Sequence, residues 1–252
     1  AFTAMTSAYT VYSFVDQDTL LYALVCCTLF MIPGVPLINT VIDTINDHIL
    51  SGITRGIRTI LIVGSMTLGM AIALYFSPVP SFNYIDIKPH LITVEQVIGS
   101  CMAAISFAVL FNVPYRLLPY IGIGGIICVD VRNWLLVDFS FSIPGATFCG
   151  AAVVSLIFMR LAPMLRASGP VLIVPSAIAL MPGVLLYRFL FNILHINGLN
   201  EAGLLHAMQN GITGVLTIIA IAVGVAIPNV LAKRYLARLK QKRLDELLAN
   251  RH

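Results

Sequence analysis

Residues 211–227 read GITGVLTIIAIAVGVAI, a run without a single charged side chain. A helix of about 20 such residues crosses the hydrocarbon core of a membrane. The same composition extends outward over the whole chain, because 59% of the 252 residues are hydrophobic, 10% are charged, and the mean hydropathy is +0.94. Soluble domains carry about 25% charged residues. The sequence therefore predicts an integral membrane protein and excludes a soluble enzyme.

Seven stretches of the chain have the length and composition of a membrane span. Residues 1–15 are also apolar but shorter, and we interpret them as the end of a further helix. Residues 78–92 contain three prolines, which predicts a loop. The expected fold is an all-α, polytopic transmembrane helical bundle of about seven spans plus a partial N-terminal helix. The spans are 19–37, 56–77, 93–113, 117–137, 141–162, 169–190 and 203–230.

The charge distribution sets the expected orientation. Residues 233–252 carry seven basic and two acidic side chains, with leucines at helical spacing. With this tail in the cytoplasm, threading the spans backwards places twelve of the fifteen lysines and arginines there, as the positive-inside rule requires. We therefore predict a multi-pass inner-membrane protein whose cytoplasmic C-terminus is a basic amphipathic helix on the lipid surface. Because the positive charge is local, nucleic acid is not an expected partner.

A short pattern occurs twice and predicts two interrupted helices. The two copies are LFMIPGVPL at 29–37 and IALMPGVLL at 178–186, and Gly-Ile-Thr follows each, at 52–54 and 211–213. The threading gives the copies opposite directions, which is the inverted-repeat architecture of many secondary transporters. Proline removes a backbone donor, so Pro33-Gly34 and Pro182-Gly183 would break their helices and expose polar backbone to a water-filled solute site. The alternative is that both are packing kinks.

Three motifs resemble the bacterial threonine/serine exporter family. They are Pro33-Gly34-Val35-Pro36-Leu37-Ile38-Asn39 with Asp43 one turn later, Phe111-Asn112-Val113-Pro114, and Met181-Pro182-Gly183-Val184. The chain is also similar to the related split, two-subunit dicarboxylate (succinate) exporters. The resemblance implies that 1–80 is the C-terminal part of a first transmembrane repeat, 81–92 an external linker, 93–232 a second five-helix repeat and 233–252 the tail.

The resemblance also bears on partners. In such families each half has five helices and a cytoplasmic region precedes the first, so this chain lacks the first helices. Three interpretations follow: a fragment, a processed chain, or one of two subunits that needs the missing first-half helices or a partner subunit. Besides these, the expected partners are a small-molecule substrate and the lipid bilayer, and a homo-oligomer is a further option.

Polar residues follow each break. Asn39 and Asp43 are four apart and share one face if their segment is helical. They either line the mouth of the transport path, where Asp43 would contact a substrate ammonium or take up protons, or form a solvated loop. Arg188 lies six residues after Pro182, as Asn39 does after Pro33, and would suit a substrate carboxylate. The alternative is an arginine that reaches the outer interface.

Three further polar residues lie in or beside spans. Asn112 either binds solute or caps a helix end before Pro114. Asp130 either relays protons, anchors an ammonium group, or joins an interfacial ionic network near the outer end, where Arg132 also lies. His206 either couples transport to protons, because histidine titrates near neutral pH, or packs in the helix bundle. Asp43, Asp130 and His206 are thus the candidates for proton coupling.

The sequence contains no nucleophile–base pair, metal-ligand cluster or nucleotide motif, so we predict neither an enzyme nor a bound metal or cofactor. The five cysteines lie in apolar runs and are interpreted as structural. The expected function is a secondary active exporter of small polar metabolites, foremost threonine and serine, that works by alternating access. The alternatives are a dicarboxylate exporter and a non-transporting membrane scaffold or assembly subunit.

Overall fold

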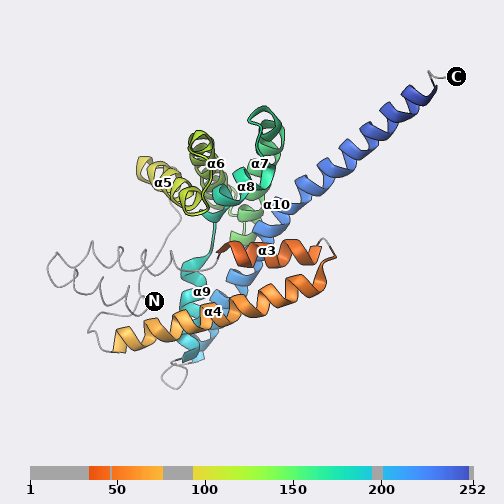
Figure 1. Ribbon diagram of the computed structural model, residues 1–252. Coiled ribbons are helices and arrows are strands. Elements are labelled where there is room, and N and C mark those ends of the chain that lie inside the picture. Colours follow the sequence, from red (N-terminus) through yellow and green to blue (C-terminus); the bar gives the residue numbers. More distant parts are fainter. Residues whose placement is uncertain (1–33, 46, 76–92, 195–200, 250–252) are drawn as a thin grey trace. The chain divides into compact units, whose positions relative to one another are not determined.

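The computed structural model describes residues 34–45, 47–75, 93–194 and 201–249, and within these ranges the chain forms helices and no strands (Figure 1). The all-helical fold expected from the composition is confirmed. The elements are α3 (Gly34–Ile45), α4 (Ile49–Tyr75), α5 (Val94–Leu110), the short 3₁₀ helix η2 (Tyr115–Leu117), α6 (Leu118–Val137), α7 (Ile143–Met164), α8 (Gly169–Ile178), α9 (Gly183–Leu194) and α10 (Glu201–Ala249).

Three helical segments among the described residues are long and apolar enough to cross a membrane. They are Tyr115–Val137, Ile143–Met164 and Gly203–Ala226. The apolar helices α5 and α8 are shorter. Residues 1–33 and 76–92, which hold the partial helix, most of the first span and the predicted loop, lie outside the described residues. The total of seven spans therefore stays a prediction.

The last span and the basic tail are one helix. α10 begins at Glu201 and continues without a break to Ala249, so the helical conformation expected for the tail is confirmed. Residues 201–249 include neither an interior glycine–proline pair nor a polar turn segment that would end the helix. Pro228 is tolerated within α10. The position of the tail at the inner leaflet stays a prediction.

The chain divides into two compact units. One comprises residues 1–89 and 181–219, and the other comprises residues 90–180 and 220–252. The first unit thus holds α3, α4, α9 and the start of α10, and the second holds α5, η2, α6, α7, α8 and the rest of α10. We refer to them as the break unit and the α6 unit, and each is described by itself.

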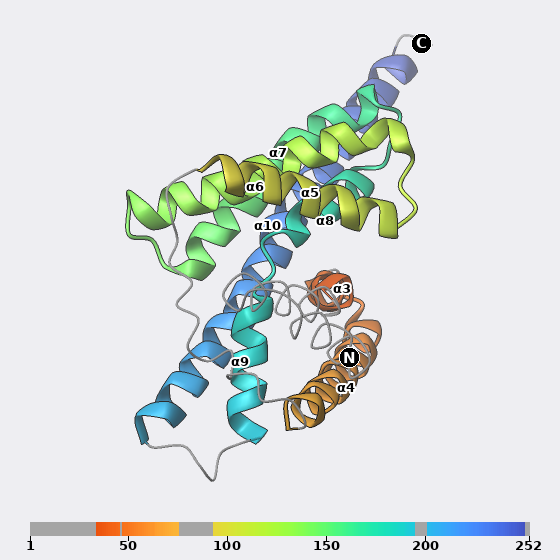
Figure 2. The same ribbon diagram turned by 90° about the vertical axis from the view of Figure 1, so that its left-hand side faces the viewer.

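In the α6 unit, α6 packs against α5, α7 and α8, which lie around it in both views (Figures 1 and 2). Glycines make these approaches possible. A Cβ atom on Gly125 would lie 2.5 Å from the Ala104 Cβ on α5, and one on Gly150 would lie 2.5 Å from the Cys128 carbonyl oxygen. In lipid, helix association relies on such close van der Waals contact, because lipid tails are as apolar as the side chains.

Two buried serines add hydrogen bonds between the helices of this unit. The Ser176 hydroxyl on α8 lies 3.1 Å from the Ile121 carbonyl oxygen on α6, and it shares its proton with the Leu172 carbonyl of its own helix. The Ser155 hydroxyl on α7 donates to the Val225 carbonyl on α10 at 3.2 Å. Both side chains are fully buried. Hydroxyl groups of this kind join helices where water cannot compete for the bond.

In the break unit, each of the two short helices meets the following long helix at a glycine. A Cβ atom on Gly52 of α4 would lie 2.4 Å from the Thr44 hydroxyl and 3.0 Å from the Thr40 carbonyl of α3. A Cβ atom on Gly211 of α10 would lie 2.4 Å from the Phe189 ring of α9. α4 also packs against α9. The glycine of each Gly-Ile-Thr is therefore a helix-crossing point.

Four helix ends use a residue other than glycine in the left-handed conformation. At the end of α5, Asn112 has φ 54°, its N–H donates to the Val109 carbonyl, and the Val113 N–H reaches back to the Ala108 carbonyl at 3.0 Å. This pattern satisfies the carbonyls that a helix end leaves unpaired. Asp47, Ser140 and Arg166 have φ between 49° and 64° at the ends of α3, α6 and α7.

The glycine packing predicts a pair of opposite effects. Gly150→Ala places a methyl group against the Cys128 backbone, which can move only with its helix, so we expect a loss of about 1–3 kcal/mol. Gly99→Ala is the matched control, since nothing lies within 4 Å of a Cβ there, and it should be neutral or stabilising by up to about 1 kcal/mol. Thermal unfolding in detergent measures both. Equal midpoints for the two variants would contradict the packing.

The helix-end geometry predicts a ranking at Asn112. Asn112→Gly should leave the unfolding midpoint unchanged or raise it, because glycine adopts positive φ without strain. Asn112→Val should lower the midpoint, with a loss of about 1–2 kcal/mol in the free energy of unfolding, because a β-branched residue is strained in that conformation. The comparison uses thermal unfolding of both variants in the same detergent. A valine variant as stable as the glycine variant would show that the backbone at this turn is not held left-handed.

Candidate functional site

The two short helices of the break unit begin alike. α3 starts at Gly34 and α9 at Gly183, each the glycine of a Pro-Gly-Val, and each helix has 12 residues. At the second break α8 ends at Ile178, and four residues precede α9. There the Leu186 N–H donates to the Pro182 carbonyl, which starts the new helix. The interruption predicted at Pro182-Gly183 is therefore present, whereas Pro33 lies outside the described residues.

Each short helix carries two polar residues on one face. Asn39 and Asp43 are the fifth and ninth residues after Gly34, and Arg188 and Asn192 are the fifth and ninth after Gly183. Residues four apart in a helix are neighbours. Because α3 extends from Gly34 to Ile45, the segment that holds Asn39 and Asp43 is helical and is not a loop. Asn192, which is 7% exposed, was missed from the sequence, although its spacing from the break could have revealed it.

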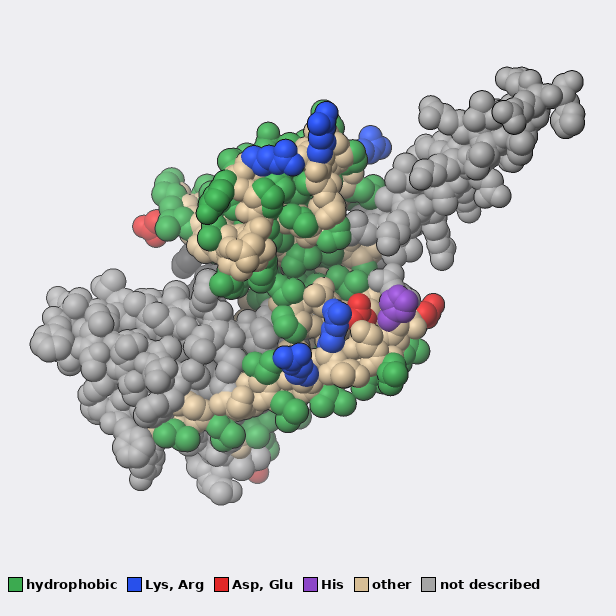
Figure 3. All heavy atoms as spheres, viewed as in Figure 1, with side chains coloured by type: hydrophobic (Ala, Val, Ile, Leu, Met, Phe, Trp, Pro, Cys, Tyr) green, Lys and Arg blue, Asp and Glu red, His purple; other side chains and the backbone are tan. Residues whose placement is uncertain are grey.

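Asp43 is held by the start of α4. Its Oδ2 accepts a hydrogen bond from the Ser51 hydroxyl at 3.2 Å and forms an ion pair with Arg55 Nη1 at 3.3 Å. The Asp43 side chain is 20% exposed and that of Arg55 is 52% exposed. Figure 3 shows acidic, basic and histidine side chains gathered where α3 turns into α4. Both of these contacts orient the carboxylate through Oδ2.

On α9, Arg188 is half-buried and Asn192 is buried, and Pro182 and Gly183 at the start of the helix are buried too. A guanidinium in this setting is suited to a carboxylate, which it binds through two parallel hydrogen bonds. A buried amide such as Asn192 both donates and accepts, so it can recognise a hydroxyl group. The short helix α3 therefore carries one acidic group, Asp43, and α9 carries one basic group, Arg188, each with an amide one turn away on the same helical face.

The remaining predicted residues lie elsewhere. Asn112 is exposed at the left-handed end of α5, where its described role is to end that helix. His206 is exposed on α10. Asp130 is half-buried within α6, and its Oδ1 is buried without a hydrogen-bond donor in the part of the chain that the structure describes. The structure does not bring these three together with the polar faces of α3 and α9 into one cluster of described contacts.

A hydrogen-bonded chain joins α5 and α6. Arg132 Nε donates to Asn133 Oδ1, and Asn133 Nδ2 donates to Gln96 Oε1, both at 3.2 Å. Asn133 is 3% exposed. Arg132 thus bonds to a neutral amide, and among the described residues it forms no ion pair with Asp130. Sequence reasoning missed Asn133 and its bond to Gln96, because nothing in the spacing of residues 37 apart reveals a pair.

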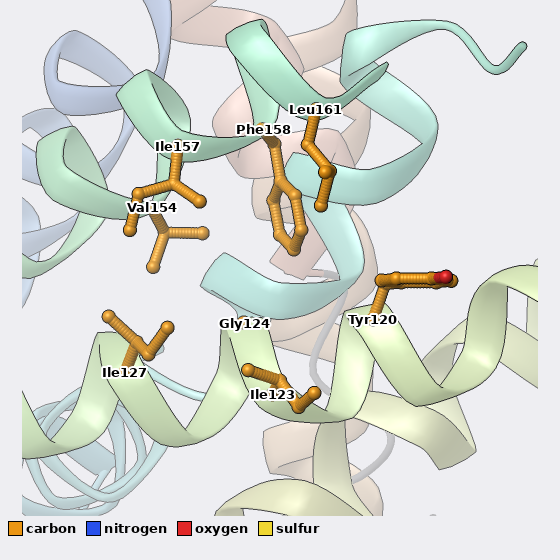
Figure 4. Close-up of a pocket in the computed structure, with 8 residues that line it drawn as sticks. All are labelled: Tyr120, Ile123, Gly124, Ile127, Val154, Ile157, Phe158 and Leu161. Carbon is orange, nitrogen blue, oxygen red and sulfur yellow. The ribbon is translucent and has the colours of Figure 1, made fainter. Parts of the chain in front are cut away.

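Two cavities lined by described residues bear on the candidate site. One, of about 160 Å³, lies between α6 and α7 and has an apolar lining (Figure 4). The other is an open groove along α4 beside Arg58. Neither is lined by a residue of the two Pro-Gly breaks, so a polar pocket between the breaks stays a proposal. Over the described ranges, no three His, Cys, Asp or Glu side chains lie close enough together to hold a metal ion.

Comparison with known families matches two parts of the chain. The family described as Threonine/Serine exporter, ThrE matches residues 96–231, and a second threonine/serine exporter family matches residues 1–77. No solved structure matches the chain. The resemblance drawn from the three motifs is confirmed, and the long apolar helices agree with a protein that works in a membrane. The chain belongs to the threonine/serine exporter family and is a membrane exporter.

Proposed function

We propose that this exporter moves threonine and serine out of the cytoplasm by alternating access around two broken-helix repeats of opposite orientation. One observation carries the proposal. The two Pro-Gly motifs each start a helix of 12 residues, and each helix has polar residues at the fifth and ninth positions after its glycine. Interrupted helices in corresponding positions of two repeats are where transporters bind their solutes.

A second correspondence supports a duplication. A Cβ atom on Gly52 would lie 2.4 Å from the Thr44 hydroxyl and 3.0 Å from the Thr40 carbonyl, and one on Gly211 would lie 2.4 Å from the Phe189 ring. Thr40 and Phe189 each lie six residues after the glycine that starts the short helix. This partial correspondence supports the proposal that the two hairpins are repeats.

The charges match an amino-acid zwitterion. Asp43 would bind the substrate ammonium through its carboxylate, and Arg188 would bind the substrate carboxylate through its guanidinium. Asn39 and Asn192, one turn from each charge, would contact the hydroxyl group that distinguishes threonine and serine from alanine. A site that hydrogen-bonds a hydroxyl rejects an analogue without it, because its own polar groups would be left unpaired.

Proton coupling would use a carboxyl group inside the membrane. Of the three candidates, Asp130 and His206 lie within helical segments of spanning length, and Asp130 has a buried oxygen with no hydrogen-bond donor among the described residues. A carboxyl group in such a place is a candidate for proton transfer by default. His206 is exposed and Asp43 is paired with Arg55, so we rank them behind Asp130. Movement would be outward, with the basic C-terminus in the cytoplasm of an inner-membrane protein.

A dicarboxylate exporter is the second candidate, because the half-buried Arg188 suits any substrate with a carboxylate. This function would require a second cationic group close to Arg188. The two functions separate at Asp43, since its negative charge attracts an ammonium group and repels a second carboxylate. The same variant therefore tests both.

We expect Asp43→Asn to lower threonine and serine export roughly 10- to 100-fold, which corresponds to about 1.5–3 kcal/mol for a hydrogen bond to a charged group. Arg188→Gln should have a similar effect. Asp47→Asn is the matched control, because Asp47 is exposed and its left-handed conformation suits asparagine. The measurement is efflux of labelled threonine, serine and succinate from proteoliposomes, at equal protein levels.

Each outcome decides something. Efflux of threonine or serine that is lost in Asp43→Asn and kept in Asp47→Asn supports the proposal. Succinate efflux that increases in Asp43→Asn would favour the dicarboxylate function instead. If none of the three substrates leaves the vesicles faster than from protein-free ones, with the missing first-half helices supplied, the proposed function is wrong. Loss of the paired Arg55 contact costs little, since that side chain is half-exposed, so a folding defect is not the expected cause.

A further inference from the structure

The cavity between α6 and α7 is a groove with a uniformly apolar lining. Each helix contributes four residues at the spacing of one helical face. They are Tyr120, Ile123, Gly124 and Ile127 on α6, and Val154, Ile157, Phe158 and Leu161 on α7. Figure 4 shows the two rows facing each other across the groove, with the Tyr120 hydroxyl as the polar atom among the labelled side chains. A polar solute such as an amino acid would find no partner along it.

The groove is open at its sides. Ile123 is 54% exposed and Ile157 is 41% exposed, whereas Phe158 at the floor is buried. The floor is fixed by packing, because a Cβ atom on Gly124 would lie 2.5 Å from both the Phe158 ring and the Ser176 hydroxyl. α6 and α7 include two of the segments that are long and apolar enough to span a membrane. From Tyr120 to Ile127 the groove extends over about 10 Å of helix.

Arginines gather at one end of this groove. Arg116 lies one turn before Tyr120, Arg160 adjoins Leu161, and Arg166 ends the turn after α7, and all three are exposed. No salt bridge to them occurs among the described residues. The chain has no Asp or Glu at 96–129 or 139–200, so no nearby carboxylate in sequence offsets this charge. Figure 3 shows basic side chains at this end of the α6 unit, over a hydrophobic surface.

We propose that the α6–α7 groove is a binding site for an anionic phospholipid. One acyl chain lies in the groove, and the phosphate lies at its end against Arg116 and Arg160, with Arg166 adding positive potential. Tyr120 sits between the two parts, where an aromatic side chain with one polar atom suits the boundary between hydrocarbon and headgroup. Charge complementarity selects an anionic lipid, since a zwitterionic headgroup presents a cation to the same arginines. The inference depends on membrane location and not on the transported substrate.

The test is native mass spectrometry of the whole chain in detergent with phosphatidylglycerol or phosphatidylcholine of identical acyl chains. Phosphatidylglycerol should be retained at least ten-fold more strongly. Each arginine near an anionic headgroup contributes a factor of about five, so Arg116→Gln with Arg160→Gln should remove most of this preference. Arg55→Gln with Arg58→Gln is the matched control, because it removes the same charge from exposed positions of the other unit. This control should keep the preference for phosphatidylglycerol.

A second variant tests the groove itself. Ile123→Trp with Ile157→Trp fills the groove from its exposed rim and leaves the arginines in place. It should lose phosphatidylglycerol although its helix content, measured by circular dichroism, is unchanged. The soluble headgroup glycerophosphoglycerol should not compete at equal concentration. Equal retention of both lipids, full retention by the arginine or tryptophan variants, or competition by the free headgroup would each overturn the proposal.

Discussion

Close approach of backbones is the constraint on which this structure depends. Inside a membrane, an apolar side chain gains nothing by leaving lipid for another apolar side chain, so helices associate only where they pack without gaps. Gly125 and Gly150 bring α5 and α7 to the surface of α6, and a Cβ atom on Gly224 of α10 would lie 2.8 Å from the Phe148 carbonyl oxygen on α7. Beside these contacts, side chains of α6 and α7 line the apolar groove, whose floor is the close approach of Gly124 to Phe158.

The same shortage of water governs the helix ends. Every backbone carbonyl released at a turn must find a donor in the chain, and the four left-handed residues supply this by turning the following N–H groups back. At the break before α9, the backbone groups are paired without a left-handed residue. There the Gly183 N–H donates to the Met181 carbonyl at 2.9 Å, and proline at 182 has no N–H to satisfy. A Pro-Gly pair thus interrupts a helix and leaves fewer backbone N–H groups in need of an acceptor.

The sequence predicted what depends on composition and local chemistry, and not what depends on neighbours in space. Long apolar runs predicted α6 and α7 to within two residues at each end, and Pro-Gly predicted the start of α9. The helical state of residues 34–45 was left open against a loop, because amphipathic segments of that length are ambiguous. The bond between Gln96 and Asn133 and the left-handed turn at Asn112 could not be predicted, because both depend on how chain segments meet.

The proposed site, with Asp43 on α3 and Arg188 on α9, would favour a zwitterion over a dianion on physical grounds. Each buried charge of a substrate must be matched, since an unmatched ion in a membrane costs more than its remaining contacts return. The polar faces of α3 and α9 offer one carboxylate, Asp43, and one guanidinium, Arg188. In the proposed site, an amino acid would match both groups and enter with no net charge, whereas succinate would meet Arg188 and face Asp43 with its second carboxylate. Arg55, half-exposed and 3.3 Å from Asp43, would weaken this discrimination without reversing it, because Arg55 remains largely hydrated.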